Sequence, residues 1–336
     1  MFDCSKELRA FHDDEILLPQ SQRDILRGNR DASQERLKAG LEKDEKPKPV
    51  AFVKQGSYAM HTMVQHPDND YDIDDGVVFN KEDLIGAQGA DMAALDARKM
   101  VLAAVTSDVF KQPPELKTNC VRIYYNEGYH IDIPVYRQKD ETDEGYELAS
   151  SDWKKSNPEG VTKWFQDCLK KKKSGKEPEG EHQMRRMVCL LKAFSSHRTS
   201  WNMPSGFALT ILVNECYSAY NLREDEAFYN LLTALHLRLG ITYVVRHPVL
   251  SENLTETASD PDMKELRERI EWALAKLKIT NDPKCDTPQA LKAWGEVFNT
   301  KYFDSDKIRA FANESLDIFG SVPSSPVVKN GGGRYG

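Results

Sequence analysis

The hydrophobic and polar positions of the chain predict a helix first and strands after it. Residues 21–44 (SQRDILRGNRDASQERLKAGLEKD) are typical of one long helix, with Ser21 as its N-cap. Pro47 and Pro49 follow, and they end the helix because proline lacks the amide hydrogen that helical bonding needs. The hydrophobic run that comes next, 50–54 (VAFVK), is typical of a strand.

Three further runs with alternating apolar residues predict more strands. The first is 71–79 (YDIDDGVVF). The other two, 119–125 (NCVRIYY) and 129–136 (YHIDIPVY), are close enough to form a hairpin across Asn126-Glu127-Gly128. Between these strands, the Ala-rich stretch 90–110 predicts a helix.

The pattern changes after about residue 150, where we expect five or six amphipathic helices and few strands. Asp260-Pro261 and Thr287-Pro288 each combine a capping residue with proline at the first helical position. The last stretch is rich in Gly, Ser and Pro, which is typical of a flexible tail. The expected fold class is therefore α+β, with a mixed lobe over 1–150, a helical lobe over 151–319 and a tail over 320–336. A cleft between two lobes is a common place for a ligand site.

Composition narrows the class of protein. Of the 336 residues 40% are hydrophobic, which is enough for a core, and the net charge of −7 argues against a grip on long nucleic acid. No apolar run approaches the ~20 residues that span a bilayer, and the charged N-terminus has no signal-peptide core. The six cysteines are scattered without a CxxC pair, so we expect reduced thiols. We expect a cytoplasmic protein with no membrane contact.

Acidic residues on two of the predicted strands form a candidate site. Alternate residues of a strand face the same side, so Asp72 and Asp74 share one face while Asp75 takes the other. On the later strand, Asp132 points away from the side on which Ile131 and Ile133 enter the core. If the two strands lie side by side, three carboxylates come together.

Three uncompensated carboxylates in a small space repel one another, so such a cluster needs a cation. Oxygen ligands in this number suit Mg²⁺. Two readings stay open at this point: the acidic residues can simply be solvated, and Asp70 with Asp72 has the same parity as the favoured pair.

The turn Gly56-Ser57 after the first strand supports an anion site. Glycine lets a backbone approach a phosphate closely, and Ser57 offers a hydroxyl and an amide where a helix begins. Alone, such a pair is more often an ordinary turn.

These motifs together resemble a known family. The order QGSYAMHTM, NDYDIDDGVVF and YHIDIPVY resembles the polymerase-β-type nucleotidyltransferases, and most closely the bacterial CD-NTases, the cGAS/DncV-like nucleotidyltransferases. The resemblance implies a polymerase-β-like nucleotidyltransferase lobe packed on a C-terminal helical lobe, with the active site in the cleft between them. It also implies that Asp72, Asp74 and Asp132 are catalytic metal ligands. Asp70 falls outside the motif.

The resemblance also extends into the second half of the chain. Residues 185–198 resemble the helix whose lysine, here Lys192, meets the donor triphosphate. Ser205 corresponds to the phosphate-contacting serine that opens the next helix, and without the family it would be only an N-cap. Residues 151–165 resemble the segment that links the lobes, and 247–255 resemble a segment near the base pocket. Gln55, Gly56 and Ser57 complete the expected nucleotide-binding set.

The resemblance implies an activity: synthesis of a cyclic di- or trinucleotide second messenger from ATP, GTP or both, in antiphage (CBASS) signalling. Two Mg²⁺ ions would be the cofactors, and Mn²⁺ could replace them. One alternative is transfer of nucleotides to an RNA or a small molecule. An RNA acceptor would need basic residues, and the one basic patch of the sequence is Lys170–Lys173 with Lys176. That patch is more typical of an exposed linker or helix end. A non-catalytic nucleotide-binding protein is the other alternative, which the presence of all three carboxylates disfavours.

The C-terminal residues Asn330-Gly331-Gly332-Gly333-Arg334-Tyr335-Gly336 cannot support a core. Some family members end in a tail that a ubiquitin-like conjugating partner of the E1/E2 type joins to a target amine. The resemblance therefore implies that Gly336 is a conjugation point, with Arg334 and Tyr335 as recognition residues. An ordinary frayed end is the alternative.

Overall fold

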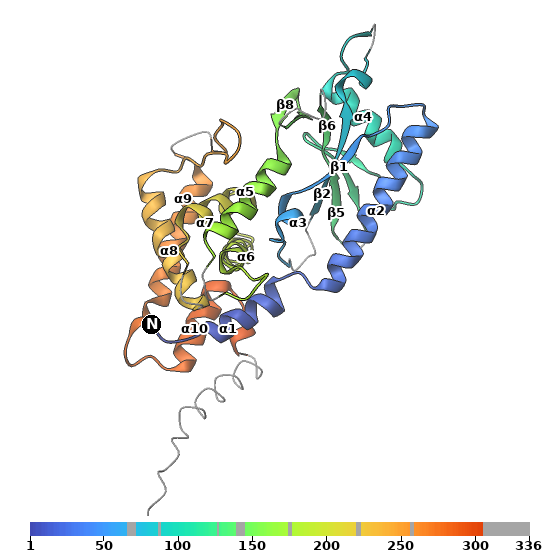
Figure 1. Cartoon of the computed structure of the whole chain (residues 1–336). Coiled ribbons are helices and arrows are strands. Elements are labelled where there is room, and N and C mark those ends of the chain that lie inside the picture. Colours follow the sequence, from blue (N-terminus) through green and yellow to red (C-terminus); the bar gives the residue numbers. More distant parts are fainter. Residues whose placement is uncertain are drawn as a thin grey trace, which may run out of the picture.

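The protein consists of a sheet lobe and a helical lobe that lie side by side (Figure 1). This computed structural model describes residues 1–65, 72–86, 89–125, 128–138, 145–173, 177–219, 223–255 and 259–304. The expected α+β class is confirmed. No helix in these ranges is both long and apolar enough to cross a bilayer.

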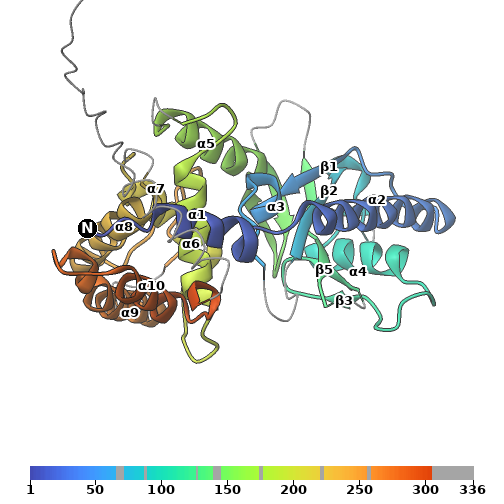
Figure 2. The same cartoon turned by 90° about the horizontal axis from the view of Figure 1, so that it is seen from below.

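The sheet lobe is built on eight strands, and two long helices cover one of its faces (Figures 1 and 2). The helices are α2 (Gln20–Lys43) and α4 (Ala94–Val105). A short helix, α3 (Gly56–Met60), and a 3₁₀ turn, η2 (Lys81–Asp83), lie beside β2. The strands are β1 (Ala51–Gln55), β2 (Asp72–Asn80), β3 (Glu115–Leu116), β4 (Val121–Tyr124), β5 (His130–Ile133), β6 (Val135–Gln138), β7 (Tyr146–Ala149) and β8 (Trp153–Ser156).

The centre of the sheet is β2, which has a neighbour on each edge. On one edge β1 runs antiparallel to it. On the other edge β5 and β6 run parallel to it, and in both pairings each residue of β2 faces the residue 58 positions later, as in Asp74 with Asp132 and Val77 with Val135. Pro134 separates β5 from β6, and its carbonyl still accepts a hydrogen bond from the Val77 amide at 2.9 Å. The two segments therefore act as one strand along β2.

The helical lobe contains α5 to α10 and also the first helix of the chain. Its core takes in Leu8 and Phe11 of α1 and Ile16 of the π-helical turn η1. Packing thus divides the chain differently from the expected boundary at residue 150: the N-terminal residues join the helical lobe, and β8 stays in the sheet. The bounds are α1 (Ser5–Phe11), η1 (His12–Ile16), α5 (Pro158–Lys171), α6 (Gln183–Ser196), α7 (Gly206–Cys216), α8 (Glu224–Ile241), α9 (Pro261–Leu277), η4 (Lys278–Asn281), α10 (Thr287–Phe298) and η5 (Tyr302–Asp304).

Most of the predicted elements are present, including the hairpin of β4 and β5 and six helices after residue 150 among the described residues. Three details were wrong. Helix α2 starts after Pro19, whose carbonyl accepts the first helical bond, so Ser21 is not the cap. The helix predicted over 90–110 covers only Ala94–Val105, because Thr106 turns to an extended conformation. Asp286 caps α10 through a capping box with Gln289.

Candidate active site

The predicted carboxylates lie on two neighbouring strands, β2 and β5, and Gln55 of β1 continues their row. Strand pairing sets Gln55 of β1 opposite Asp74, and Asp74 opposite Asp132 of β5. Residues paired across neighbouring strands present their side chains on the same face. In the same way Asp72, two residues before Asp74 on β2, lies beside His130 of β5. The sheet register therefore brings Asp72, Asp74 and Asp132 together.

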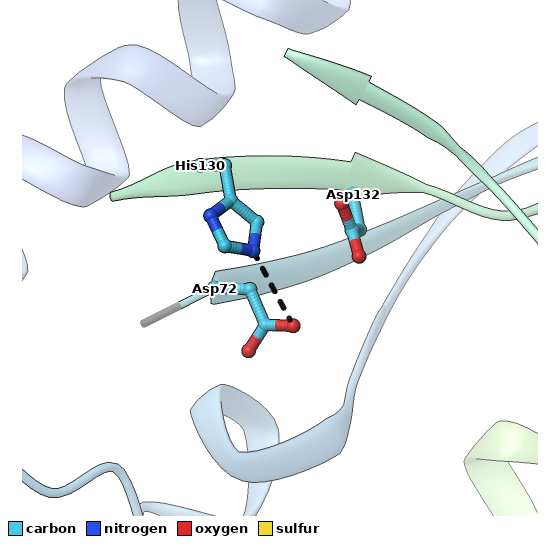
Figure 3. Close-up of side chains that lie close together, drawn as sticks. All are labelled: Asp72, His130 and Asp132. Carbon is cyan, nitrogen blue, oxygen red and sulfur yellow. Dashed lines mark ion pairs between the residues drawn. The ribbon is translucent and has the colours of Figure 1, made fainter. Parts of the chain in front are cut away.

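Asp72, His130 and Asp132 form a group that could hold a metal ion (Figure 3). One ligand atom from each lies within 4.8 Å of the other two, and His130 Nε2 is 4.0 Å from Asp72 Oδ2. Figure 3 shows the three side chains on the same side of β2 and β5. Asp74 is not part of this group, although it is the neighbour of Asp132 in the sheet.

Burial and the repulsion between neighbouring carboxylates raise the pKa values of Asp72 and Asp74. Burial raises the pKa of Asp74 to about 8, and the charges of Asp72 and Asp132 add to the rise. Burial and the charge of Asp132 also raise the pKa of Asp72. A divalent cation would relieve this repulsion, and carboxylate oxygens are ligands that Mg²⁺ accepts. The donor set therefore fits such an ion.

Asp75 lies on the opposite face, as its parity predicted. It is buried, and its Oδ2 accepts a hydrogen bond from the Gln34 side chain of α2 at 2.7 Å. Burial raises the pKa of Asp75 to about 6. Asp75 thus links the sheet to α2 and takes no part in the row.

Arg122 is a member of the site that our sequence interpretation missed. It faces Asp132 across the β4–β5 pair, and its Nε and Nη2 donate to the two carboxylate oxygens of Asp132, each at 2.7 Å. Such paired bonds are strong and fix the carboxylate plane. The signal was available, because a hairpin that turns at 126–128 sets residue 122 opposite residue 132. His130 was likewise on the correct face without being proposed as a ligand.

The turn after β1 fits tightly under the carboxylate row. Gly56 has a left-handed backbone with φ of 63°, and a Cβ there would lie 2.1 Å from Oδ2 of Asp74. Ser57 follows as the second residue of α3, as predicted, and its carbonyl accepts a hydrogen bond from the Thr62 amide. Only glycine can occupy position 56 without moving the Asp74 side chain.

Gln55 makes a side-chain contact within the sheet. The hydroxyl of Tyr136 on β6 donates to its side-chain oxygen at 2.8 Å. That bond holds the amide group in a defined orientation, with its nitrogen left to donate.

Lys192 of α6 reaches Thr62, just after α3, and Ser205 begins the neighbouring helix α7. Lys192 Nζ lies 3.2 Å from both the carbonyl and the hydroxyl oxygen of Thr62. A Cβ at Gly206 would come within 3.2 Å of Lys192 Cε, so the lysine passes the first residue of α7. Ser205 caps α7 by accepting from the Ala208 amide at 3.3 Å. Burial lowers the pKa of Lys192, while Cys189 and Asp72 oppose the shift.

We expect Lys192→Ala to weaken nucleotide use more than Lys171→Ala does. A charge-assisted bond to phosphate would be lost, which corresponds to roughly a tenfold to hundredfold rise in KM for the triphosphate. Lys171 is exposed at the end of α5 and serves as the matched control. Steady-state kinetics with both variants checks this, and equal effects would return Lys192 to a purely structural role.

The basic patch at the end of α5 is only partly solvated. The ammonium of Lys172 donates to the carbonyls of Asn214 and Tyr217 at the end of α7. Lys172 does lie at the end of α5, but it is only half exposed, because it caps a neighbouring helix. Lys176, Asp70 and the tail with Gly336 lie outside the described residues.

Comparison with known proteins agrees with this arrangement. The family described as "Cyclic GMP-AMP synthase DncV-like, nucleotidyltransferase domain" matches residues 50–136, which hold the turn, β2 and β5. Three solved structures share the fold. Vibrio cholerae DncV, bound to the linear intermediate pppA(3′,5′)pG, has a TM-score of 0.72 at 17% identity, covering 89% of this chain and 96% of that one.

Escherichia coli DncV, bound to 3′-deoxy GTP, has a TM-score of 0.68 at 17% identity, covering 86% of this chain and 93% of that one. The Bradyrhizobium diazoefficiens CD-NTase CdnG, in complex with GTP, has a TM-score of 0.69 at 14% identity, covering 95% and 100%. These likenesses show that the chain shares the fold of the three proteins. Residues 50–136 match the DncV-like nucleotidyltransferase domain.

Proposed function

We propose that this protein joins nucleoside triphosphates into a cyclic di- or trinucleotide, using ATP, GTP or both. The observation that carries the proposal is the pairing of Asp74 with Asp132. Asp72 lies two residues away on β2, and the Gly56-Ser57 turn packs against Asp74. The solved structures of DncV and CdnG that share this fold hold GTP, 3′-deoxy GTP or a linear dinucleotide intermediate.

Each side chain has a proposed part in the reaction. Asp72, Asp74 and Asp132 would hold two Mg²⁺ ions. Those ions supply a lowered pKa for the attacking hydroxyl and neutralise charge on the triphosphate. Asp132 would take the proton of that hydroxyl, and Arg122 keeps its carboxylate oriented.

Other side chains would hold the phosphates. Lys192 offers an ammonium group, Ser57 and Ser205 offer hydroxyls at helix starts, and Gln55 offers its amide nitrogen. Helix N-termini favour negative charge, so these groups act in the same sense. A linear intermediate would turn in the site and close by the same chemistry.

The test is incubation of the pure protein with labelled ATP and GTP and Mg²⁺, with no nucleic acid present. We expect a product whose mass equals that of a cyclic oligonucleotide without a terminal triphosphate. Phosphatase should not digest it. Linear products only, or products that form only with added RNA, would favour transfer to another acceptor. No turnover in any mixture would favour the non-catalytic alternative.

We further propose a place in antiphage signalling, because that is the setting of the family that the motifs resemble. The expectation that Gly336 is joined to a target by an E1/E2-type partner stays a prediction, since the described residues end before it.

A further inference from the structure

A second group of basic side chains surrounds a cavity of about 330 Å³ where the two lobes meet. Its walls come from α1, η1, the first turn of α2, the end of α3, and α6 with the residues just before it. The volume lies in the range of small-ligand pockets. None of Asp72, Asp74, Asp132 or Lys192 lines the cavity, so it is separate from the carboxylate row.

Positive charge exceeds negative charge around this cavity. Four arginines and three histidines line it, against two carboxylates. Both carboxylates are already engaged: Asp13 accepts from Arg9 at 2.9 Å, and Glu181 accepts from Arg9 at 2.9 Å and Arg186 at 3.3 Å. Arg186 also pairs with the buried Glu224. Arg9 and Arg186 are therefore compensated.

Arg185 and Arg23 are not compensated by any carboxylate in the part of the chain that the structure describes. Arg185 Nε is buried and has no hydrogen-bond partner there, and neither has the buried Nδ1 of His182. Among the described residues, Arg23 Nε donates only to the Leu18 carbonyl, at 2.8 Å. Burial lowers the pKa of Arg185, and the nearby charges of Arg186 and Arg23 lower it further.

His61 brings a third basic group to the same place. It is the left-handed cap of α3, and burial together with Arg185 and Arg23 lowers its pKa. Two uncompensated guanidinium groups and an imidazole thus converge on one cavity. Guanidinium groups match the geometry of phosphate oxygens and can donate two parallel bonds to them.

We propose that this cavity is a second anion site, in which Arg185, Arg23 and His61 hold a phosphate group. A doubly charged oxyanion offsets both guanidinium charges, which a single carboxylate does not. The site adjoins Lys192, because His61 directly precedes Thr62, whose oxygens lie 3.2 Å from Lys192 Nζ. Arg185 and Lys192 also lie two turns apart on α6. The proposal does not depend on which product the enzyme makes.

The test is isothermal titration of the full-length protein with inorganic phosphate, in the absence of divalent cations. Lys192→Gln is the parent protein for this experiment, so that phosphate bound at Lys192 does not contribute. We expect one site in the parent. Adding Arg185→Gln or Arg23→Gln should weaken phosphate binding roughly tenfold or more, because a charge-assisted bond is lost.

Lys163→Gln is the matched control, because it removes one positive charge from an exposed position on α5. It should leave phosphate binding unchanged, and thermal unfolding should show that all variants are folded. AMP titrated in parallel identifies the source of the phosphate group: tighter binding than phosphate indicates a nucleotide, and equal binding a free phosphate. No phosphate binding by the parent, or equal binding by Arg185→Gln and Lys163→Gln, overturns the proposal.

Discussion

Asp72→Asn and Asp74→Asn should each abolish product formation with Mg²⁺ while leaving the fold intact. Asparagine keeps the shape of the side chain and removes the negative charge that holds the cation. Changes to groups that merely surround a metal's ligands cost roughly 10–100-fold, so loss of a ligand should exceed 100-fold in kcat/KM. Removing charge from a row in which burial already raises the pKa of Asp74 should also stabilise the metal-free protein.

Two controls sharpen this experiment. Asp75→Asn alters the same strand on the opposite face, where the side chain bonds Gln34, and should keep activity. Asp70→Asn should be mild, because the family motif excludes Asp70. The measurement is turnover of labelled triphosphate, with thermal unfolding of each variant. An inactive Asp70→Asn together with an active Asp74→Asn would show that the assigned register of the acidic motif is wrong.

The alternation of polar and apolar residues predicted which face of its strand each carboxylate takes. Ile131 and Ile133 are buried, and Asp132 lies between them facing the other way, so parity alone chose its side. That β2 and β5 are neighbours was a further assumption. Pro134 makes it hard to predict, because proline separates β5 from β6 although both keep the same register with β2. The family resemblance resolved the choice between Asp70 and Asp74 that parity left open.

Other features depend on contacts between segments far apart in the chain. Leu8 and Phe11 of α1 pack in the helical lobe, more than 140 residues before that lobe begins at α5, and no local pattern shows the partner of an amphipathic helix. Lys172 belongs to a run of lysines that is typical of an exposed helix end, yet it caps α7. The Arg122–Asp132 pair was within reach, since hairpin register alone sets those two residues opposite each other.

Gly56→Ala should cause a large loss of activity without loss of the fold. The new Cβ would lie 2.1 Å from Asp74 Oδ2, so the carboxylate has to leave its position in the row. The left-handed backbone at position 56 adds a penalty of about 1–2 kcal/mol for any side chain. Displacing one metal ligand should lower kcat by roughly 100-fold, whereas the unfolding temperature should fall by only a few degrees.

Gly28→Ala is the matched control for this substitution. Gly28 lies inside α2, and a Cβ there meets nothing within 4 Å. Alanine favours a helix interior over glycine by about 0.5–1 kcal/mol, so Gly28→Ala should be slightly more stable and fully active. Kinetics and thermal unfolding of the two variants separate a general effect of alanine from the close approach of Gly56 to Asp74. If Gly56→Ala turns over triphosphate as fast as Gly28→Ala, the turn does not position Asp74 for catalysis.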